Sequence, residues 1–327
     1  MRVDCHTHFL PAPFRDRLRE ADGEVRIERH GDQEFVCHTT GSFPLFPGFR
    51  DPEARLEWMD DHDVDTTLAS VSTPNPNEGP ISIDESRTLV RAINDGFADL
   101  QDEYPGRIAG LGTLPLREPD EAVAELDRVA DLGLAGVALP TTVRGMKLSH
   151  PDLEPVFNRL DDLDLTAVMH PGRNEVSHTF EDEEWIFNPL AVFPTETTIQ
   201  VARLIFDGFF DRHDFDLVVY HMGGALPYLV GRLERGRDQF RSGPDQYPKQ
   251  PVVEYLREFH YDTISFHPPA MDLAVETVGA ERLLFGTDYP FGMEKADQTL
   301  EDLEELELED EVRAGVMGET ATALFDL

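Results

Sequence analysis

Short apolar runs of strand length recur along the chain, and segments with a helical spacing of apolar residues separate most of them. The first run is "MRVDCHTHF" at residues 1–9, and the last is "LLFGTDYP" at residues 283–290. Apolar runs of this length, bounded by turn residues, are typical of buried strands. Between these two, the other predicted strands fall at residues 65–72, 108–115, 134–140, 166–172, 216–223 and 259–265.

The segments between the runs carry helix signals. Asp51 can cap a helix and Pro52 suits its first position, which predicts a helix from there to residue 59. Strands that alternate with helices indicate a parallel sheet, and eight such units favour a closed (β/α)8, or TIM, barrel over an open doubly wound α/β sheet. Further helices are predicted over residues 84–103, 119–132, 151–163, 196–211, 225–240, 268–279 and 308–325.

One segment departs from this rhythm. Residues 24–41 alternate apolar and polar positions around a Gly31-Asp32 turn, which predicts a small β-hairpin inserted after the first strand, roughly within residues 20–50. We expect it to lie over the mouth of the barrel. The Pro-rich stretches 43–52 and 73–80 indicate loops. No sequence repeat or Gly/Ser-rich linker interrupts the chain, so residues 1–327 are expected to form one domain.

The composition adds an extreme charge balance, with 65 acidic against 28 basic residues and a formal net charge of -37. Nucleic acid and anionic membranes would be repelled by this charge, and no apolar run approaches the roughly 18 residues of a membrane span. Acidic pairs scattered through amphipathic segments predict a solvated surface. We interpret the acidity as adaptation to a high-salt (halophilic) cytoplasm, where salt screens carboxylate repulsion; an acidic protein from ordinary salt is the alternative.

Cys5 and Cys37 are the only cysteines, and no secretory apolar region follows Met1, so a reducing, cytoplasmic location is expected. Strand alternation would turn Cys5 to the face opposite Asp4 and His6. A Cys5–Cys37 bridge is therefore not expected.

His6 and His8 stand two apart in the first predicted strand, so both side chains face the same side. Alone, this pattern also fits packed or solvated histidines. However, His170 ends the fifth predicted strand, His221 the sixth and Asp288 the eighth. Because side chains at the carboxyl ends of barrel strands converge at one mouth, all five are expected to meet there.

Imidazole and carboxylate groups suit a divalent metal such as zinc, with manganese as the alternative. We predict that His6, His8, His170 and Asp288 bind one ion that keeps a position open for water, whose pKa falls to about 7 when bound. His221 is either a fifth ligand or the base that acts on this water, and we favour the base.

The chain resembles the amidohydrolase-related family that includes aminocarboxymuconate-semialdehyde decarboxylase and other metal-dependent aromatic-acid decarboxylases. The motifs that carry the resemblance span nearly the whole chain and are "VDCHTHFLP", "DPEARLEWMDDHDVD", "MHPG", "NPLAVFPTETT", "YHMGGALPYLVGRL" and "FGTDYPF". The resemblance implies the same ligand set, His221 acting on the bound water, and a homodimer. It also gives Trp185 an aromatic position near the site. In the predicted mechanism, Asp288 handles protons together with His221.

The chain departs from the family pattern at three points. Phe43 falls near the place of a substrate-binding arginine in the insertion, and Arg237 and Arg241 are only near matches to an arginine that reaches a neighbouring subunit. The fourth predicted strand ends without the lysine that bridges two metals in binuclear relatives, since Lys147 lies several residues later. A single metal ion is therefore expected.

Loops after the strands are expected to form the pocket wall. Arg144 or Arg173 would clamp a carboxylate, because guanidinium binds carboxylate in a bidentate fork. The alternative for each is a surface arginine paired with one of the many acids. Other predicted wall residues are Ser72, Thr73, Asn75, Asn174, Trp185, His267 and Phe291.

The predicted function is nonoxidative decarboxylation of a small unsaturated or aromatic carboxylic acid, with protonation of the carbon that loses carbon dioxide. Two alternatives stay open on the same residues. One is metal-dependent hydrolysis of an amide or lactone. The other is a barrel that binds metal without catalysis. The expected partner is a small organic acid, with no nucleic acid and no membrane.

Overall fold

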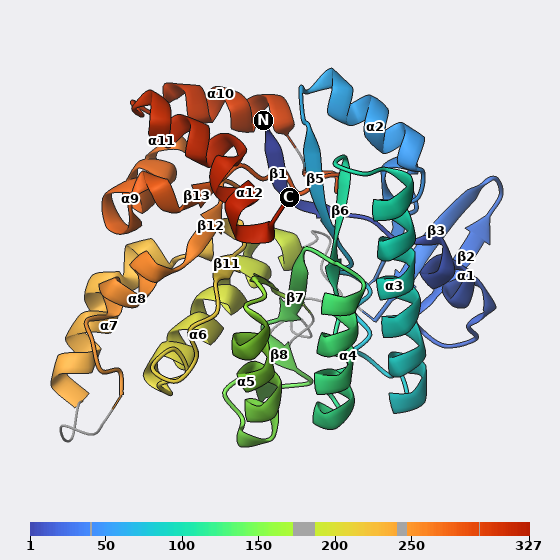
Figure 1. Cartoon of the computed structure of the whole chain (residues 1–327), viewed down its shortest axis with the longest axis horizontal. Helices are drawn as coiled ribbons and strands as arrows, with labels where there is room; N and C mark the ends of the chain where they lie inside the picture. The colour runs from blue at the N-terminus through green and yellow to red at the C-terminus, as the bar shows by residue number, and fades with distance from the viewer. Residues whose placement is uncertain (40, 173–186, 241–246, 294) are drawn as a thin grey trace.

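Eight parallel strands form the centre of the computed structural model, which describes residues 1–39, 41–172, 187–240, 247–293 and 295–327 (Figure 1). All eight predicted strands are present in this sheet, which confirms the prediction of a TIM barrel. In spatial order they are β1 (Val3–His8), β5 (Thr66–Ser70), β6 (Ile108–Gly112), β7 (Gly136–Pro140), β10 (Ala167–His170), β11 (Leu217–Val219), β12 (His260–Asp262) and β13 (Leu283–Leu284).

The sheet is nearly closed, because the segment around β13 returns to β1. The Cys5 amide donates to the Phe285 carbonyl at 2.9 Å, and the Asp288 amide donates to the His6 carbonyl at 2.9 Å. Nearer the carboxyl end of β1, the His8 amide donates to the Tyr289 carbonyl at 2.7 Å. These bonds connect the segment after β13, the last strand of the sheet, to β1, the first strand. They place the segment that carries Asp288 beside the two histidines of β1.

Helices surround the sheet, as Figure 1 shows. Those predicted from the sequence are α2 (Pro52–Asp61), α3 (Ile83–Glu103), α4 (Pro119–Asp131), α5 (Glu154–Leu163), α6 (Phe193–Phe206), α7 (Leu226–Phe240) and α9 (Pro268–Val278). Three described helices were not predicted, namely α1 (Ala12–Glu20), α8 (Val252–Glu258) and α10 (Ala296–Glu305). All three lie in segments to which the sequence pattern assigned no element.

The helix predicted over 308–325 is interrupted. It divides into α11 (Asp310–Ala314), a π-helical turn (Gly315–Glu319) and α12 (Thr320–Phe325). Gly318 lies in this turn, where a Cβ atom would stand 2.6 Å from the Met1 carbonyl oxygen. Only glycine allows so close an approach of the two backbones, so the break in the helix packs the C-terminal segment against the start of β1.

The insertion is larger than a hairpin. The predicted hairpin is present as β2 (Arg26–His30) and β3 (Gln33–His38), and a third antiparallel strand, β4 (Gly41–Pro44), pairs with β3. A 3-10 turn, η1 (Pro47–Phe49), follows it. The prediction of a loop over 43–52 is therefore wrong at its start, because Phe43 and Pro44 belong to β4 and complete this small sheet.

The amino end of the barrel is filled by apolar side chains, and α12 closes it. The interior cluster includes Val3, Leu68, Val168, Val218 and Leu284 from the strands, together with Ala321 and Phe325 from α12. The Thr166 hydroxyl donates to the Leu324 carbonyl. This arrangement leaves the opposite, carboxyl end of the strands as the place where polar side chains converge.

β1 contributes to both ends because its pairing shifts by one residue. Asp4 pairs with Thr67, whereas Thr7 pairs with Ala69. An extra residue in one strand changes which side chains face inward. Cys5 consequently lies in the interior cluster with Val3, although simple alternation placed it on the face opposite His6. Both cysteines are free.

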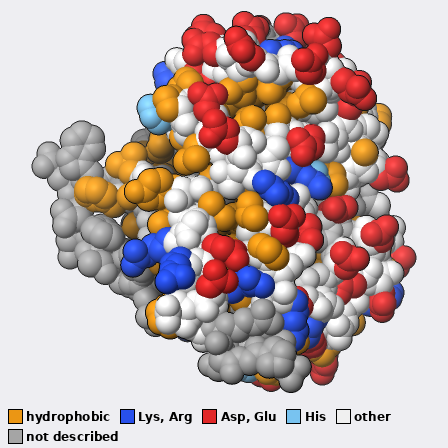
Figure 2. Space-filling view, turned by 90° about the vertical axis from the view of Figure 1, so that its left-hand side faces the viewer, with side chains coloured by type: hydrophobic (Ala, Val, Ile, Leu, Met, Phe, Trp, Pro, Cys, Tyr) orange, Lys and Arg blue, Asp and Glu red, His pale blue; other side chains and the backbone are white. Residues whose placement is uncertain are grey.

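Figure 2 shows acidic side chains over much of one face of the molecule, densest at the upper edge, where α10 and α11 lie in Figure 1. The acidic side chains of residues 307, 309, 310 and 311 are exposed, as the sequence predicted for a solvated surface. Within the described residues, no helix is both long and apolar enough to cross a membrane.

Candidate metal centre and its pocket

Four predicted ligands meet at the carboxyl end of the barrel. His6 and His8 come from β1, His170 ends β10, and Asp288 follows β13. One nitrogen or oxygen from each residue lies within 4.8 Å of the others. The Nε2 atom of His8 is 3.0 Å from Oδ1 of Asp288, and that of His6 is 3.6 Å from the same oxygen. The tertiary structure therefore gathers these four residues into one cluster.

In each of the three histidines, the Nδ1 atom contacts a polar group outside the four-residue cluster. Nδ1 of His6 lies 2.6 Å from Oδ2 of Asp262, and Nδ1 of His170 lies 2.6 Å from the Pro171 carbonyl oxygen. Since both partners only accept hydrogen bonds, these Nδ1 atoms carry the proton and leave the Nε2 lone pairs free. Nδ1 of His8 is 3.2 Å from the Ser70 hydroxyl.

The geometry fits a divalent cation. Nε2 of His6 lies 3.1 Å from Nε2 of His8. Two lone pairs that face each other at this distance repel, and a cation bound by both nitrogens removes the repulsion. Three neutral imidazoles and one carboxylate are a donor set that zinc and related metals accept.

The electrostatics of the cluster favour the ligand forms of these groups. Burial, with the neighbouring histidines, holds the pKa of His6 and of His170 well below the ordinary value, so both rings are neutral at pH 7. Burial would raise the pKa of Asp288, but its close contacts with His8 and His6 outweigh burial and lower that pKa. The carboxylate is therefore ionised beside neutral rings.

His221 lies next to the cluster and does not belong to its four-residue set. It follows β11, and its ring centre is 5.2 Å from that of His6 and 5.1 Å from that of His170. Its Nδ1 atom is buried and has no hydrogen-bond partner among the described residues. The position beside the four residues, with a ring nitrogen unused, suits a residue that transfers protons.

Sequence reasoning missed Asp262, which ends β12 and is fully buried. Besides the bond from His6, its carboxylate accepts the backbone amides of His221 at 2.8 Å and Met222 at 2.7 Å. Burial raises the pKa of Asp262 to about 6, although His221 and the backbone amides favour the ionised form. Its position at the carboxyl end of a predicted strand was the available signal.

Sequence reasoning also missed Arg55, a fully buried residue of α2. Its guanidinium donates to the Thr7 hydroxyl at 2.9 Å, to the His8 carbonyl, and to the Gly48 carbonyl at 3.5 Å. Arg55 therefore ties the strand that carries His8 to the insertion. Because burial, the main cause, lowers its pKa only to about 10, the side chain stays charged at neutral pH.

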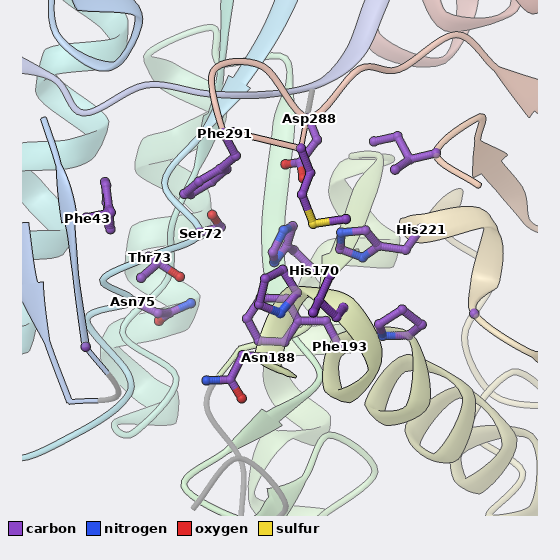
Figure 3. Close-up of a pocket in the computed structure, with 18 of the residues that line it drawn as sticks. Phe43, Ser72, Thr73, Asn75, His170, Asn188, Phe193, His221, Asp288 and Phe291 are labelled. Atoms are coloured by element: carbon purple, nitrogen blue, oxygen red, sulfur yellow. The ribbon is translucent and has the colours of Figure 1, made fainter. Parts of the chain in front are cut away.

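A cavity of about 1160 Å³ opens above the cluster. Figure 3 shows His170, His221 and Asp288 on one side of it, with Phe43, Thr73 and Asn75 across from them. Its described lining is largely apolar, and the insertion supplies part of the wall, as predicted for a segment over the mouth. The aromatic lining residues are His38, Phe43, Phe46, Phe49, His170, Phe193, His221, Tyr228, Phe266 and Phe291.

Three phenylalanines form a wall beside the metal cluster. The ring of Phe291 lies 5.1 Å from that of His8 and 4.9 Å from that of Phe49, edge to face in both pairs. The ring of Phe43 is 5.1 Å from Phe49 and 5.6 Å from Phe291. A flat ring bound near the cluster would contact this wall.

The predicted substrate contacts divide into three groups. Asn75 and Phe291 line the cavity, as do Ser72 and Thr73. Arg144 lies exposed in the turn between β8 (Thr142–Val143) and β9 (Met146–Lys147), and His267 lies exposed at the start of α9. Neither is among the described lining residues, because both side chains point to solvent. The predicted contacts at Arg173, Asn174 and Trp185 lie outside the described residues, as does Arg241.

Lys147 also lies away from the cluster. Its Nζ atom is 2.5 Å from Oδ2 of Asp207, which accepts the Ser149 hydroxyl as well. Within the described part of the chain, the group of side chains placed to hold a metal is the one at His6, His8, His170 and Asp288. The lysine is thus engaged in a surface ion pair.

Comparison with known proteins agrees with this site. The amidohydrolase family model matches residues 3–327. The 2-amino-3-carboxymuconate-6-semialdehyde decarboxylase of Dictyostelium discoideum is 29% identical over 303 residues, which cover 89% of this chain and 82% of that protein. The gamma-resorcylate decarboxylase of Rhizobium radiobacter is 31% identical over 253 residues, which cover 73% of this chain and 76% of that one.

The fold also matches a solved structure. The apo form of Metarhizium anisopliae IDCase superimposes with a TM-score of 0.87 at 26% identity, over 100% of this chain and 97% of that one. The predicted resemblance to the decarboxylase branch is confirmed by these relatives. The chain belongs to the amidohydrolase family.

Proposed function

We propose that this protein is a metal-dependent nonoxidative decarboxylase of a small aromatic or unsaturated carboxylic acid. The observation that carries the proposal is the buried cluster of His6, His8, His170 and Asp288 with His221 beside it, at the floor of an aromatic-lined cavity. The decarboxylases among the relatives support the reaction class.

His6, His8, His170 and Asp288 would hold one divalent ion, zinc first and manganese as the alternative. When bound, such an ion supplies a positive centre that orients the substrate carboxylate and stabilises negative charge on the substrate. Asp262, Ser70 and the Pro171 carbonyl orient the three imidazoles from behind. The site is therefore preorganised by the barrel itself.

The remaining chemistry belongs to proton transfer. His221 would donate a proton to the carbon that bears the carboxylate, and Asp288 would be the second group that handles protons. The bond to the carboxylate then breaks, its electron pair returns to the ring or double bond, and carbon dioxide leaves. The net change replaces a carboxylate by hydrogen. The wall of Phe43, Phe49 and Phe291 would hold the ring in place, with Asn75 offering a polar contact.

Several finer properties complete the proposal. Residues 1–327 would act as one domain in a reducing cytoplasm, which the two free cysteines support. The net charge of -37 supports function in high salt. A homodimer is proposed from the family resemblance, and the exposed apolar side chains Leu190, Ile199 and Tyr228 on and near α6 and α7 support it.

The test combines metal analysis with a carbon dioxide assay. The protein is purified in high salt, its metal content is measured, and gas release is followed on a panel of aromatic and unsaturated acids that includes 2,6-dihydroxybenzoate. One ion per chain with gas release supports the proposal. Metal without gas on the whole panel, but with turnover of amides or lactones, would assign a hydrolase. Metal without any turnover would indicate a noncatalytic barrel.

A further inference from the structure

Four hydrogen-bond donors converge on the carboxylate of Asp262. Its Oδ2 atom accepts hydrogen bonds from Nδ1 of His6 at 2.6 Å and from the His221 amide at 2.8 Å. Its Oδ1 atom accepts hydrogen bonds from the Met222 amide at 2.7 Å and from the Ile264 amide at 3.3 Å. One buried side chain thus contacts both a residue of the metal cluster and the backbone of the residue that would transfer protons.

The backbone that Asp262 holds has an unusual conformation. His221, Met222, Gly223 and Gly224 have φ angles of 57°, 54°, 69° and 63°. Residues other than glycine adopt this left-handed region at an energetic disadvantage, and they persist there when the surroundings enforce it. The successive amides of His221 and Met222 form a small concave donor site that favours an anion, and the Asp262 carboxylate fills it.

We propose that Asp262 is a positioning residue that serves two functional groups at once. It keeps the proton of His6 on Nδ1, so that Nε2 offers its lone pair to the metal, and it holds the left-handed turn that presents the His221 ring to the substrate. This inference rests on the proposed function for the role of His221. Its metal-binding half stands on the geometry of His6 alone.

Only a carboxylate can satisfy this site. An asparagine at position 262 has one acceptor oxygen and one donor group. If the amide group faces His6 and His221, the proton of His6 moves to Nε2 and the lone pair for the metal is lost. If it faces Met222 and Ile264 instead, donors face donors at the turn. Either orientation damages one of the two functions.

The test is Asp262→Asn, with Asp4→Asn as its matched control. Asp4 is an equally buried carboxylate on β1 that accepts the Thr287 hydroxyl at 2.6 Å and the amides of His6 and Thr287. Among the described residues, its hydrogen bonds go to Thr287 and to the His6 backbone amide, and none goes to a side chain of the metal cluster. A purely structural role for Asp262 predicts that both variants lose stability and that neither changes metal affinity specifically.

Metal affinity is measured on the apo proteins by competition with a chelating dye, using zinc as the probe and no substrate. Asp262→Asn should bind zinc about 10- to 100-fold more weakly, the range found when a partner behind a metal ligand is removed. Asp4→Asn should stay within about threefold of the parent. Equal affinities for Asp262→Asn and the parent would overturn the inference, whether or not the protein proves to be a decarboxylase.

Two further readouts separate the roles. Nitrogen-15 NMR of the apo protein, with His6 assigned through His6→Gln, should place the ring proton on Nδ1 in the parent. An Nε2 proton in the parent would contradict the proposed orientation. With zinc at saturation, kcat of Asp262→Asn should stay at least about tenfold below the parent, because His221 is no longer held. Full recovery of kcat would overturn the His221 half.

Discussion

At the amino end of the barrel, Val3, Val168 and Leu284 pack against Phe325 of α12, and the interior there is a closed apolar core. A few residues further along the same strands, His6, His170 and Asp288 meet at the floor of an open cavity. The two ends share their strands and differ in the residues that those strands present and in the segments that cover them. Apolar packing that stabilises the fold is thus concentrated at the amino end. Polar groups whose burial is unfavourable are concentrated at the carboxyl end.

β12 shows the same contrast within three residues. His260 starts the strand and Asp262 ends it, so both lie on one face of the strand. His260 is a buried ring whose Nδ1 has no partner in the part of the chain that the structure describes, whereas Asp262 accepts a hydrogen bond from His6 of the metal cluster. A buried polar residue therefore acquires a function only where neighbouring strands bring chemically matched groups to it.

The largest expected effect is a loss of turnover from a substitution at the mouth of the barrel. His221→Ala should lower kcat by about 10²- to 10⁴-fold, the range of a general acid or base, while the metal content stays at the parent level. His6→Ala is the comparison variant, and it should lose the metal. Steady-state kinetics and elemental analysis on both variants provide the measurement. A metal-free His221→Ala protein would show that His221 is a ligand, and unchanged kcat would remove it from the mechanism.

The next effect concerns the amino end. Phe325→Ala should lower the free energy of unfolding by about 3 to 5 kcal/mol, because it removes a buried ring from the interior cluster. Urea denaturation measures this loss, and kcat/KM of the folded protein should change less than about twofold. Leu327→Ala, at a residue 36% exposed, is the control and should stay within about 0.5 kcal/mol. A large loss of kcat/KM would mean that the two ends are coupled.

The smallest effect is a pH dependence at His260. Burial, with Arg282 nearby, lowers the pKa of His260 to about 4, against roughly 6.5 in an unfolded chain. Between these values the unfolded chain binds a proton that the folded chain does not, so stability falls as pH drops from 6.5 to 4. Over that window the parent should lose roughly 3 kcal/mol more than His260→Gln, since one pKa unit corresponds to about 1.4 kcal/mol.

Urea denaturation of the two proteins at pH 7 and pH 4, at constant high salt, gives this difference. The comparison cancels the other groups that titrate in the same range. If the parent and His260→Gln lose the same free energy of unfolding between pH 7 and pH 4, His260 is protonated in the folded protein. The proposed difference between His260 and Asp262 on the same strand would then be wrong.

The sequence was informative wherever a residue's role follows from its place on a strand. The terminal positions of His170, His221 and Asp288 were sufficient to predict a common site, because parallel barrel strands end at one mouth. Arg144 and His267 were predicted on the same reasoning from loops, where position does not determine direction. Both side chains lie in solvent.

Asp262 and Arg55 could not be assigned from the pattern. Asp262 is separated from its partner His6 by 256 positions, and Arg55 contacts the His8 carbonyl across 47. Each looked like an ordinary polar residue in its own element. Their roles come from neighbours that only folding supplies.

The sequence by itself determined the alternation of strands and helices, the five residues that meet at the mouth, and the acidic surface, because periodicity and residue type are local properties. Only the tertiary structure decided the pairing shift in β1, the closure of the amino end by α12, and the anchoring of His6 and His221 by one carboxylate. These depend on backbone approach and hydrogen-bond direction between distant segments, which no local pattern of apolar and polar residues encodes.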